Sequence, residues 1–374
     1  MKKIELNSPA GNFEKLIGAI NYGADAVYLS GKNYGLRKYA GNFKDDDLKK
    51  ALEFVHSKNK KAYITLNIFA HNNDFNGLAE YLKYLEEIRA DAVIISDVGL
   101  LYFIKKTAPN LDIFISTQAN TLNKYAVKFW QELGVKRIIL ARELSITEIR
   151  EIREATDIEL EVFIHGAVCI SYSGRCFLSK YLTGRDANSG ECTHPCRWRY
   201  FLVEEKRQGE YFEIEQDESG SYIFNSKDLN AISLLPDFID MGIDSIKIEG
   251  RMKSVYYTAS VTAVYRNAID LYYRDKNEFK NRLEFWNNEL TKVSHRKYHL
   301  GFYKRGMPTA EDYNYAESVY YRNYDFVGIV CDFVKYEEKL CALVEVRAKI
   351  KKGERLEILS PSLDNKEFVI NEII

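Results

Sequence analysis

Eight short apolar runs, each followed by an amphipathic stretch, constrain the fold of this chain more than any other feature of its sequence. The runs lie at 4–6, 26–29, 62–68, 92–96, 112–116, 137–140, 160–165 and 245–248. The amphipathic stretches have the helical period and lie at about 12–22, 44–58, 75–89, 98–107, 121–133, 145–155, 228–241 and 254–273. Eight β-then-α units over roughly 270 residues predict an α/β fold, a (β/α)8 TIM-like barrel.

An open, doubly wound sheet is the alternative architecture for the same alternation. That fold carries a G-x-G-x-x-G turn after its first strand when it binds dinucleotides, whereas the turn at 8–12 reads SPAGN and has one glycine. The barrel is therefore favoured. Ser145 followed by Glu148 predicts a capping box at the start of one helix.

Three regions follow from the changes in pattern along the chain. We assign 1–293 to the barrel with an insertion at 166–227 after the seventh strand, 294–324 to a connector, and 325–374 to a small β-barrel-like module. The second half of the insertion alternates like antiparallel strands, and 276–293 predicts one more helix. Cys331 and Cys341 lie in apolar strand contexts, so we interpret both as core residues of the module.

Composition limits the function classes. The formal net charge is −1, so no global basic field indicates nucleic acid, although a local basic groove remains compatible with it. The N-terminal MKKIELNSPAGN lacks the apolar run of a secretory signal, and no stretch approaches the ~18 apolar residues of a membrane span. We therefore expect a cytoplasmic protein without a membrane partner, in which thiols stay reduced.

Charged residues occur on strands that a barrel would bury. Lys247 and Glu249 share one face of the last strand, and period-two alternation puts Glu161, Phe163 and His165 on one face of the seventh. An internal ion pair, Lys247 with Glu161 or Glu249, is the simpler interpretation. Because polar groups recur at the same ends of several strands, where barrel enzymes have their active sites, we favour a polar substrate pocket.

These positions supply the candidate site residues. As catalytic groups for proton transfer or base hydrogen bonding we expect His165, Glu249 and Lys247. For His165, a purely structural role, in which the ring hydrogen-bonds to a backbone carbonyl, fits a histidine at a strand end equally well. As substrate-binding groups, cations for anions among them, we expect Arg37, Asn67, Gln118, Arg142, Glu161 and Arg251. Cations and rings at 197–200 and 251–257 fit RNA binding or an ordinary solvated loop.

Four of the six cysteines lie within 28 residues, in the pattern C-x6-C-x15-C-x3-C. They are Cys169, Cys176, Cys192 and Cys196. Structural zinc sites pair their ligands more closely, whereas iron–sulfur clusters accept four thiolates at varied spacing. The pattern favours an iron–sulfur cluster, with zinc and unliganded thiols as the alternatives.

Several motifs resemble those of the collagenase-like peptidases, peptidase family U32. The family signature E-x-F-x-x-G-[SA]-x-C-x(4)-G-x-C-x-x-S is matched by Glu161, Phe163, Gly166, Ala167, Cys169, Gly174, Cys176 and Ser179. The segments SPAGNFEKL, GADAVYLSG, LRKYAGNF, NSKDL and IKIEGRMKS are similar too. Within the family, RDANSGECTHPCRW and the small C-terminal module look most like the subgroup of bacterial tRNA hydroxylation proteins.

The resemblance implies a function that the residues alone do not specify. It implies conversion of the wobble uridine of tRNA to 5-hydroxyuridine, with prephenate as cosubstrate and a [4Fe–4S] cluster on the four cysteines. tRNA is then the expected partner, with a second family member as another. A peptidase is the first alternative, although H-E-x-x-H and G-x-S-x-G motifs are lacking. A non-enzymatic iron–sulfur or RNA-binding subunit of a larger complex is the second.

Overall fold

The computed structural model describes most of the chain. The described residues are 3–32, 34, 35, 42–168, 178–185, 191–193, 195, 201–203, 211–213, 216, 217, 220, 221, 227–304 and 321–374. All statements below concern these residues.

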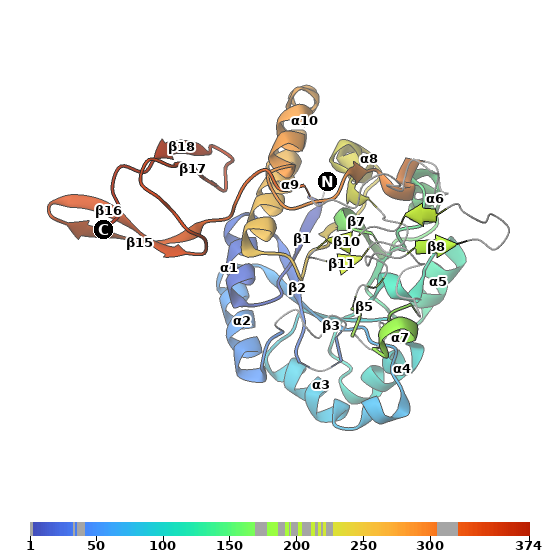
Figure 1. The fold of residues 1–374 in the computed structure, drawn as a ribbon. Helices are drawn as coiled ribbons and strands as arrows, with labels where there is room; N and C mark the ends of the chain where they lie inside the picture. Colours follow the sequence, from blue (N-terminus) through green and yellow to red (C-terminus); the bar gives the residue numbers. More distant parts are fainter. Residues whose placement is uncertain are drawn as a thin grey trace.

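Eight parallel strands close into a barrel, as the sequence predicts (Figure 1). They are β1 (Glu5–Pro9), β2 (Ala26–Leu29), β3 (Lys61–Leu66), β4 (Ala92–Ile95), β5 (Ile113–Ile115), β6 (Arg137–Ile139), β7 (Glu159–Ala167) and β13 (Ser245–Ile248). The barrel closes because β13 pairs in parallel with both β1 and β7. The open-sheet alternative is thereby excluded.

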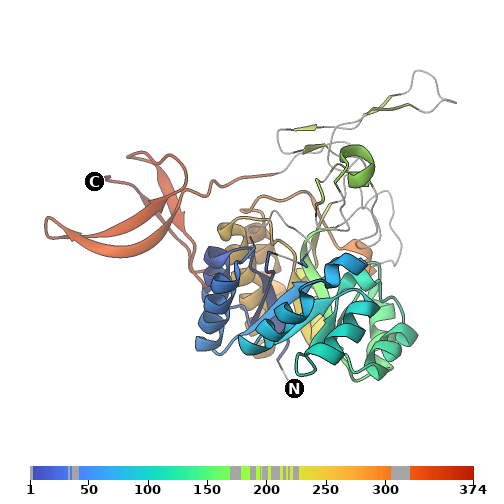
Figure 2. The same ribbon diagram turned by 90° about the horizontal axis from the view of Figure 1, so that it is seen from below.

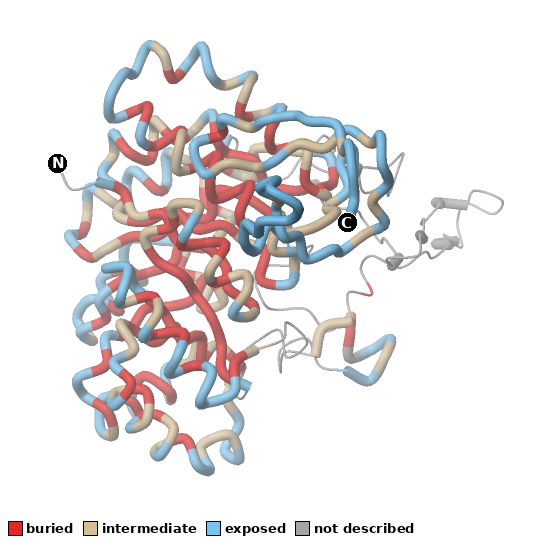
Figure 3. Tube along the Cα trace, turned by 90° about the vertical axis from the view of Figure 1, so that its left-hand side faces the viewer, coloured by how far each residue is buried: buried red, intermediate tan, exposed pale blue. Residues whose placement is uncertain are grey.

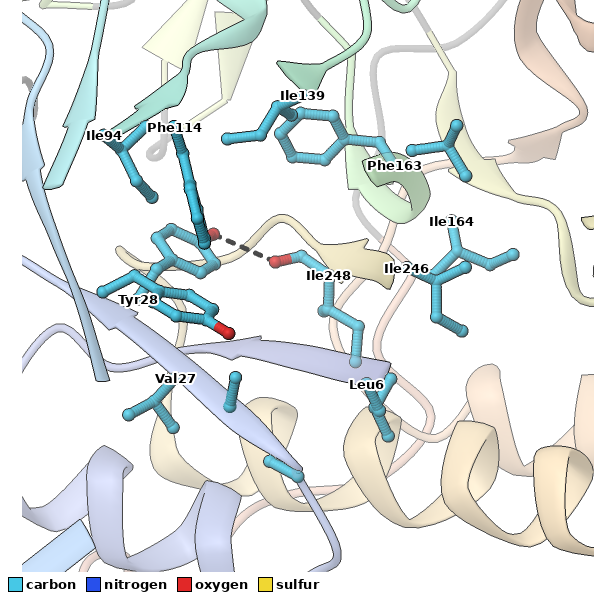
Figure 4. Packing of buried hydrophobic residues seen from close by; sticks show 14 of the residues in the cluster. Leu6, Val27, Tyr28, Ile94, Phe114, Ile139, Phe163, Ile164, Ile246 and Ile248 are labelled. Atoms are coloured by element: carbon cyan, nitrogen blue, oxygen red, sulfur yellow. Dashed lines mark hydrogen bonds between the residues drawn. The ribbon is translucent and has the colours of Figure 1, made fainter. Parts of the chain in front are cut away.

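An outer ring of helices covers the strands. It comprises α1 (Phe13–Asn21), α2 (Asp45–Ser57), α3 (Leu78–Glu87), α4 (Val98–Thr107), α5 (Lys124–Glu132), α6 (Ile146–Glu154), α8 (Leu235–Asp240) and α9 (Val255–Arg274). Side-chain caps fix several helix starts, and the predicted capping box of Ser145 and Glu148 is present at α6. The buried residues lie between these helices and the strands and inside the barrel (Figures 3 and 4).

Helix prediction was wrong in one place. The stretch 228–241 begins as a strand, β12 (Asp228–Asn230), and continues as the short η4 (Ile232–Leu234) and α8. β12 runs antiparallel to the end of β7 and pairs with β14 (Tyr298–His299), so pairing at the sheet edge overrides the local helical pattern. The buried Asp228 accepts hydrogen bonds from Arg296, with 3.0 Å from Nε to Oδ1.

The insertion and the C-terminal segment are built from small antiparallel pairs. In the insertion, β8 (Phe201–Val203) pairs with β9 (Tyr211–Glu213), and β10 (Gln216–Asp217) pairs with β11 (Gly220–Ser221). The insertion also holds α7 (Leu178–Thr183). In the C-terminal module, β15 (Gly328–Tyr336) pairs with β16 (Lys339–Val346), and β17 (Arg355–Ile358) pairs with β18 (Lys366–Val369).

The module lies beside the barrel, away from the strands of the insertion (Figure 2). Polar contacts attach it to the segment after α10 (Lys276–Leu290). There Lys292 Nζ lies 2.7 Å from a carboxylate oxygen of Glu289 and 2.8 Å from one of Glu357. The interpretation of two cysteines as core was wrong, because on the paired strands β15 and β16 Cys331 is exposed and Cys341 is only half-buried.

A buried ionic network occupies the lower half of the barrel interior. The guanidinium of Arg137 is 2% exposed and donates to carboxylates at the start of β1 and on β7, with 2.8 Å to Glu159 Oε2 and 3.1 Å to Glu161 Oε2. Glu161 also accepts from Lys247 Nζ at 2.8 Å. Burial alone would raise the pKa of Glu161, but Lys247 and Arg137 lower it to about 2, so the carboxylate stays ionised.

Among the described residues, no helix combines the length and the apolar character that a membrane crossing requires.

Replacing Arg137 by alanine should destabilise the barrel strongly. The change leaves three carboxylates, Glu5, Glu159 and Glu161, without their shared cation, and breaking a buried pair typically costs about 3–5 kcal/mol. The free energy of unfolding in urea measures this loss. The matched control is Arg282→Ala, which removes an exposed pair with Glu278 and should cost less than about 1 kcal/mol. Equal losses in the two variants would contradict the central role of the network.

Candidate functional site

The loop after β6 places Arg142 at the mouth of the barrel, the end at which the carboxyl termini of the parallel strands lie. Its Nη1 donates to the carbonyl oxygen of Ala167 at 2.6 Å, and its guanidinium lies 3.9 Å from the ring centroid of Phe163. Its Nη2 is 3.9 Å from Glu249 Oε2. The predicted cation Arg142 and the predicted acid Glu249 therefore come together at the carboxyl ends of β6 and β13.

The backbone of Glu249 is fixed from several sides. Its N–H donates to the carbonyl of His165 at 2.9 Å, and its own carbonyl accepts from Tyr257 Oη at 2.9 Å. Gly166 has φ +105°, and a Cβ there would lie 2.4 Å from the Glu249 carbonyl oxygen. Only glycine lets the ends of β7 and β13 approach this closely, so the Glu249 side chain has a defined place at the mouth.

Tyr28 closes the same side of the mouth. Its hydroxyl donates to the carbonyl oxygen of Ile248 at 2.9 Å, the bond dashed in Figure 4, and lies 3.4 Å from Glu249 Oε2. Its ring also lies 4.2 Å from Lys247 Nζ, measured to the centroid. Tyr28 therefore separates the mouth from the ionic network below it.

A second cation lies at the ends of β3 and β13. Arg251 is buried, and its Nη1 donates to Thr65 Oγ1 at 2.8 Å. Asn67, on the same loop as the end of β3, is half-buried, and its carbonyl accepts from Ser96 Oγ at 3.3 Å. Arg251 and Asn67 thus belong to the mouth, as predicted from their positions after the strands.

The loops after β5 and β6 contain buried polar atoms without partners. Within the described part of the chain, no hydrogen bond satisfies Thr117 Oγ1, Gln118 Oε1, Thr121 Oγ1 or Arg142 Nε. Thr121 is adjacent to the Arg142 loop, because its carbonyl accepts from the N–H of Ala141 at 3.3 Å. Buried polar groups in native proteins are nearly always paired, so this cluster fits a polar ligand that would satisfy them.

Lys247 and Glu161 lie below the mouth and pair with each other, as the simpler of the two sequence interpretations expects. Burial lowers the pKa of Lys247, and the charge of Glu161 opposes that shift. Glu161 also accepts from Asn7 Nδ2 at 3.1 Å and from Ser245 Oγ at 2.9 Å. The polar pocket and the ion pair are therefore both present, at different depths of the barrel.

His165 does not share the inner face with Glu161 and Phe163, so that prediction was wrong. Lys247 pairs with Phe163, yet the next residue, Ile248, pairs with His165, because β7 has an extra residue at this point. The β-bulge turns His165 outward. Its ring lies among Tyr257, Tyr265 and Tyr298, and its Nδ1 is 3.3 Å from Tyr265 Oη.

The environment of His165 keeps the ring neutral. Burial lowers its pKa to about 3, although the charge of Asp228 opposes the shift. The ring is 1% exposed, so it is neither a strong base near neutral pH nor in reach of the barrel interior. Its predicted catalytic role has no geometric support on the described side of the mouth.

The cysteine segment is described in part. Cys192 is half-buried, whereas Cys169, Cys176, Cys196 and the predicted binding residue Arg37 lie outside the described residues. Thr193 donates from its N–H to Ser179 Oγ at 3.1 Å. The segment of Cys192 therefore lies beside α7, whose sequence follows Cys176. Among the described residues, no group of three or more His, Cys, Asp or Glu could hold a metal ion.

Two contributors to the site, Tyr28 and Thr121, were missed by sequence reasoning. Tyr28 belongs to a fully buried four-residue strand, and its only signal was a hydroxyl in an apolar run. Thr121 lies in the segment before α5, and its contact with the Arg142 loop depends on tertiary packing. Nothing in their local pattern distinguishes them from ordinary polar or aromatic residues.

Models of one protein family match nearly the whole chain. The model described as peptidase family U32 matches residues 11–312, and the model described as the peptidase family U32 C-terminal domain matches residues 322–374.

Similar proteins of known name modify RNA. The chain is 42% identical over 372 residues to tRNA hydroxylation protein P1 of Bacillus subtilis (strain 168), covering 100% of this chain and 87% of that protein. It is 39% identical over 402 residues to tRNA hydroxylation protein P of Escherichia coli (strain K12), covering 96% and 87%. It is 36% identical over 268 residues to the 23S rRNA 5-hydroxycytidine C2501 synthase of the same E. coli strain, covering 72% and 39%.

The buried, neutral His165 should make the protein less stable in acid. The folded-state pKa of about 3 lies below the ordinary 6.5, so the unfolded chain binds the proton first as the pH falls. The free energy of unfolding should be level above about pH 6.5 and fall toward about pH 3, by up to about 1.4 kcal/mol per pH unit from this group. Urea unfolding between about pH 7 and pH 4 measures the slope.

The variant His165→Phe should flatten that slope, because it removes the group that must lose its proton to be buried. His56→Asn, on the half-exposed side of α2, is the matched control and should keep the slope of the unmodified protein. An unchanged slope in His165→Phe would contradict the assignment of the acid sensitivity to His165.

Proposed function

Because this chain belongs to peptidase family U32, and because relatives matching nearly all of it are named for tRNA hydroxylation, we propose that it hydroxylates RNA. The finer proposal is that the substrate is tRNA and the target the C5 position of the wobble uridine. The observation that carries the proposal is that two tRNA hydroxylation proteins match 100% and 96% of this chain, with 87% of each protein covered. The polar, cation-lined mouth supports it, since a base and its phosphates present polar and anionic groups.

The mouth residues have defined tasks in this proposal. An enzyme that modifies a base takes it out of the stack and reads it in a pocket. Arg142 and Arg251 would bind anionic groups, and Gln118 Oε1 with the hydroxyls of Thr117 and Thr121 would take up hydrogen bonds that the protein leaves open. Glu249, fixed by Tyr257 and close to Arg142, is the candidate for accepting or holding a proton.

We further propose a [4Fe–4S] cluster on Cys169, Cys176, Cys192 and Cys196. The hydrogen bond from Thr193 to Ser179, which brings the segment of Cys192 beside α7, supports this ligand set. When bound, such a cluster supplies one-electron chemistry or holds the shape of the loop. Prephenate as cosubstrate and a second family member as partner remain predictions from the resemblance; a carboxylate cosubstrate fits the two arginines of the mouth.

The peptidase alternative lacks a supporting arrangement among the described residues. A thiol nucleophile needs a histidine base in reach. His194, inside the cysteine segment, lies outside the described residues, and the described histidine beside that segment is His165. It faces away from the barrel, among three tyrosines, with a pKa of about 3. A residue in that environment does not take a proton from a thiol near neutral pH.

The proposed activity can be tested by complementation. A bacterial strain lacking its U32 family members should regain 5-hydroxyuridine-derived nucleosides in tRNA when it produces this chain, as measured by mass spectrometry of digested tRNA. Arg142→Ala should reduce the recovery by about tenfold or more, because it removes the cation of the mouth. Arg282→Ala, on the exposed side of α10, is the matched control. Absence of hydroxylated nucleosides with the unmodified chain would refute the proposal.

The cluster has its own test, independent of activity. Protein purified without oxygen should contain about four iron and four sulfide per chain and absorb broadly near ~400 nm. Cys192→Ser should lower the iron content, whereas Cys331→Ser, at an exposed position of the C-terminal module, should leave it unchanged. Zinc in place of iron, or equal iron in both variants, would contradict this ligand set.

A further inference from the structure

An exposed aromatic surface lies on two neighbouring helices of the outer ring. On α4, Tyr102 is 63% exposed, and on α5, Tyr125 and Phe129 are 72% and 50% exposed. Figure 1 places α4 and α5 beside each other, and the end of α4 reaches the turn after α5, where Lys105 Nζ lies close to Gly134. Large rings exposed together are unusual on a soluble domain and mark a surface for another molecule.

Lysines surround these rings. Lys105, Lys106, Lys124 and Lys128 are exposed on the same two helices, which carry one acidic residue, Glu132. The ammonium of Lys106 lies 4.4 Å from the ring centroid of Tyr102, and that of Lys124 lies 5.7 Å from the centroid of Tyr125. The surface is therefore locally basic, although the whole chain has a formal net charge of −1.

The part of this surface at the start of α5, with Lys124 and Tyr125, adjoins the mouth of the barrel, whereas Lys105 and Lys106 lie at the other end of α4. Two residues separate the end of β4 at Ile95 from the start of α4 at Val98. α5 begins at Lys124, after the loop that follows β5. Helices that follow barrel strands begin at the carboxyl ends of those strands, where the mouth is. The loop between β5 and α5 is also the one that carries Gln118 and the two threonine hydroxyls without partners.

We propose that Tyr102, Tyr125, Phe129 and the lysines Lys106, Lys124 and Lys128 form an RNA-docking ledge that holds the nucleotides flanking the target base. This inference rests on the proposed function and adds where the RNA lies. A base drawn into the mouth leaves its neighbours without a stacking partner. Exposed rings replace that stacking without sequence preference, and lysines at their edges pair with the phosphates between the bases.

Charge complementarity selects RNA over a second copy of the chain. In a symmetric dimer each surface meets its own copy, so the lysines of the ledge would face lysines. Like charges brought together disfavour that contact, whereas a phosphate backbone supplies one negative charge per nucleotide.

Two double variants test the ledge through tRNA binding, measured by fluorescence anisotropy at several salt concentrations with the full-length protein. Lys124→Glu with Lys128→Glu should weaken binding by about tenfold or more and reduce the salt dependence, because fewer counterions are released. Tyr125→Ala with Phe129→Ala should weaken binding about tenfold with little change in the salt dependence, because stacking is not ionic. Thermal unfolding shows whether the variants remain folded.

The matched control reverses two exposed lysines on α2, Lys49→Glu with Lys50→Glu, and should bind tRNA like the unmodified chain. In addition, tRNA carrying 4-thiouridine in its anticodon loop should cross-link to α4 or α5 on irradiation. Ledge variants that bind like the control, or cross-links only elsewhere, would overturn the ledge while leaving the hydroxylation proposal intact. A protein that binds no tRNA and restores no modified nucleoside would overturn both.

A change of oligomeric state also discriminates. If the unmodified chain is a dimer and Tyr125→Ala with Phe129→Ala makes it a monomer with unchanged tRNA binding, the surface is a contact between copies and the RNA ledge is refuted.

Discussion

The buried ion network of Arg137, Glu161 and Lys247 joins β6, β7 and β13 inside the barrel. It fills the lower barrel with charges that satisfy one another, with 2.8 Å from Lys247 Nζ to Glu161 and 3.1 Å from Arg137 Nη1 to the same carboxylate. Because these charges are paired below Tyr28, the polar groups above it are not needed for closing the barrel. When the charges at one end of a barrel are paired with one another, polar atoms at the other end can remain without hydrogen-bond partners, and a ligand can reach them there.

Glycine and a bulge then decide which side chains reach the mouth. Gly166 lets the ends of β7 and β13 approach so closely that the Glu249 backbone is held by hydrogen bonds on both sides. The extra residue in β7 turns His165 out of the barrel at the same place. The mouth is therefore an arginine–carboxylate site with amide and hydroxyl groups and no histidine among its described residues, a composition suited to holding a polar base or an anion.

Much of this arrangement could be predicted. Continuous apolar runs such as AVYL and SIKI indicate strands of a parallel sheet that is buried on both faces. Eight such runs, each followed by a helix, are compatible with few chain topologies. The positions of Arg142 and Glu249 after strands β6 and β13 placed both at the mouth before any contact was known. Prediction was wrong for His165 and for the start of 228–241, because a single inserted residue and a sheet-edge pairing override local periodicity. It could not include Tyr28 or Thr121, whose roles depend on neighbours distant in sequence.

Spacing along the chain was enough to predict the alternation of strands and helices, the long cysteine-bearing insertion, and the set of polar residues at strand ends. The motifs also determined the family, which the matches at 11–312 and 322–374 bear out. The pairing of Lys247 with Glu161, the outward direction of His165 and the exposure of the rings on α4 and α5 became visible in the folded protein alone. These depend on register and on contacts between distant segments, which periodicity does not encode.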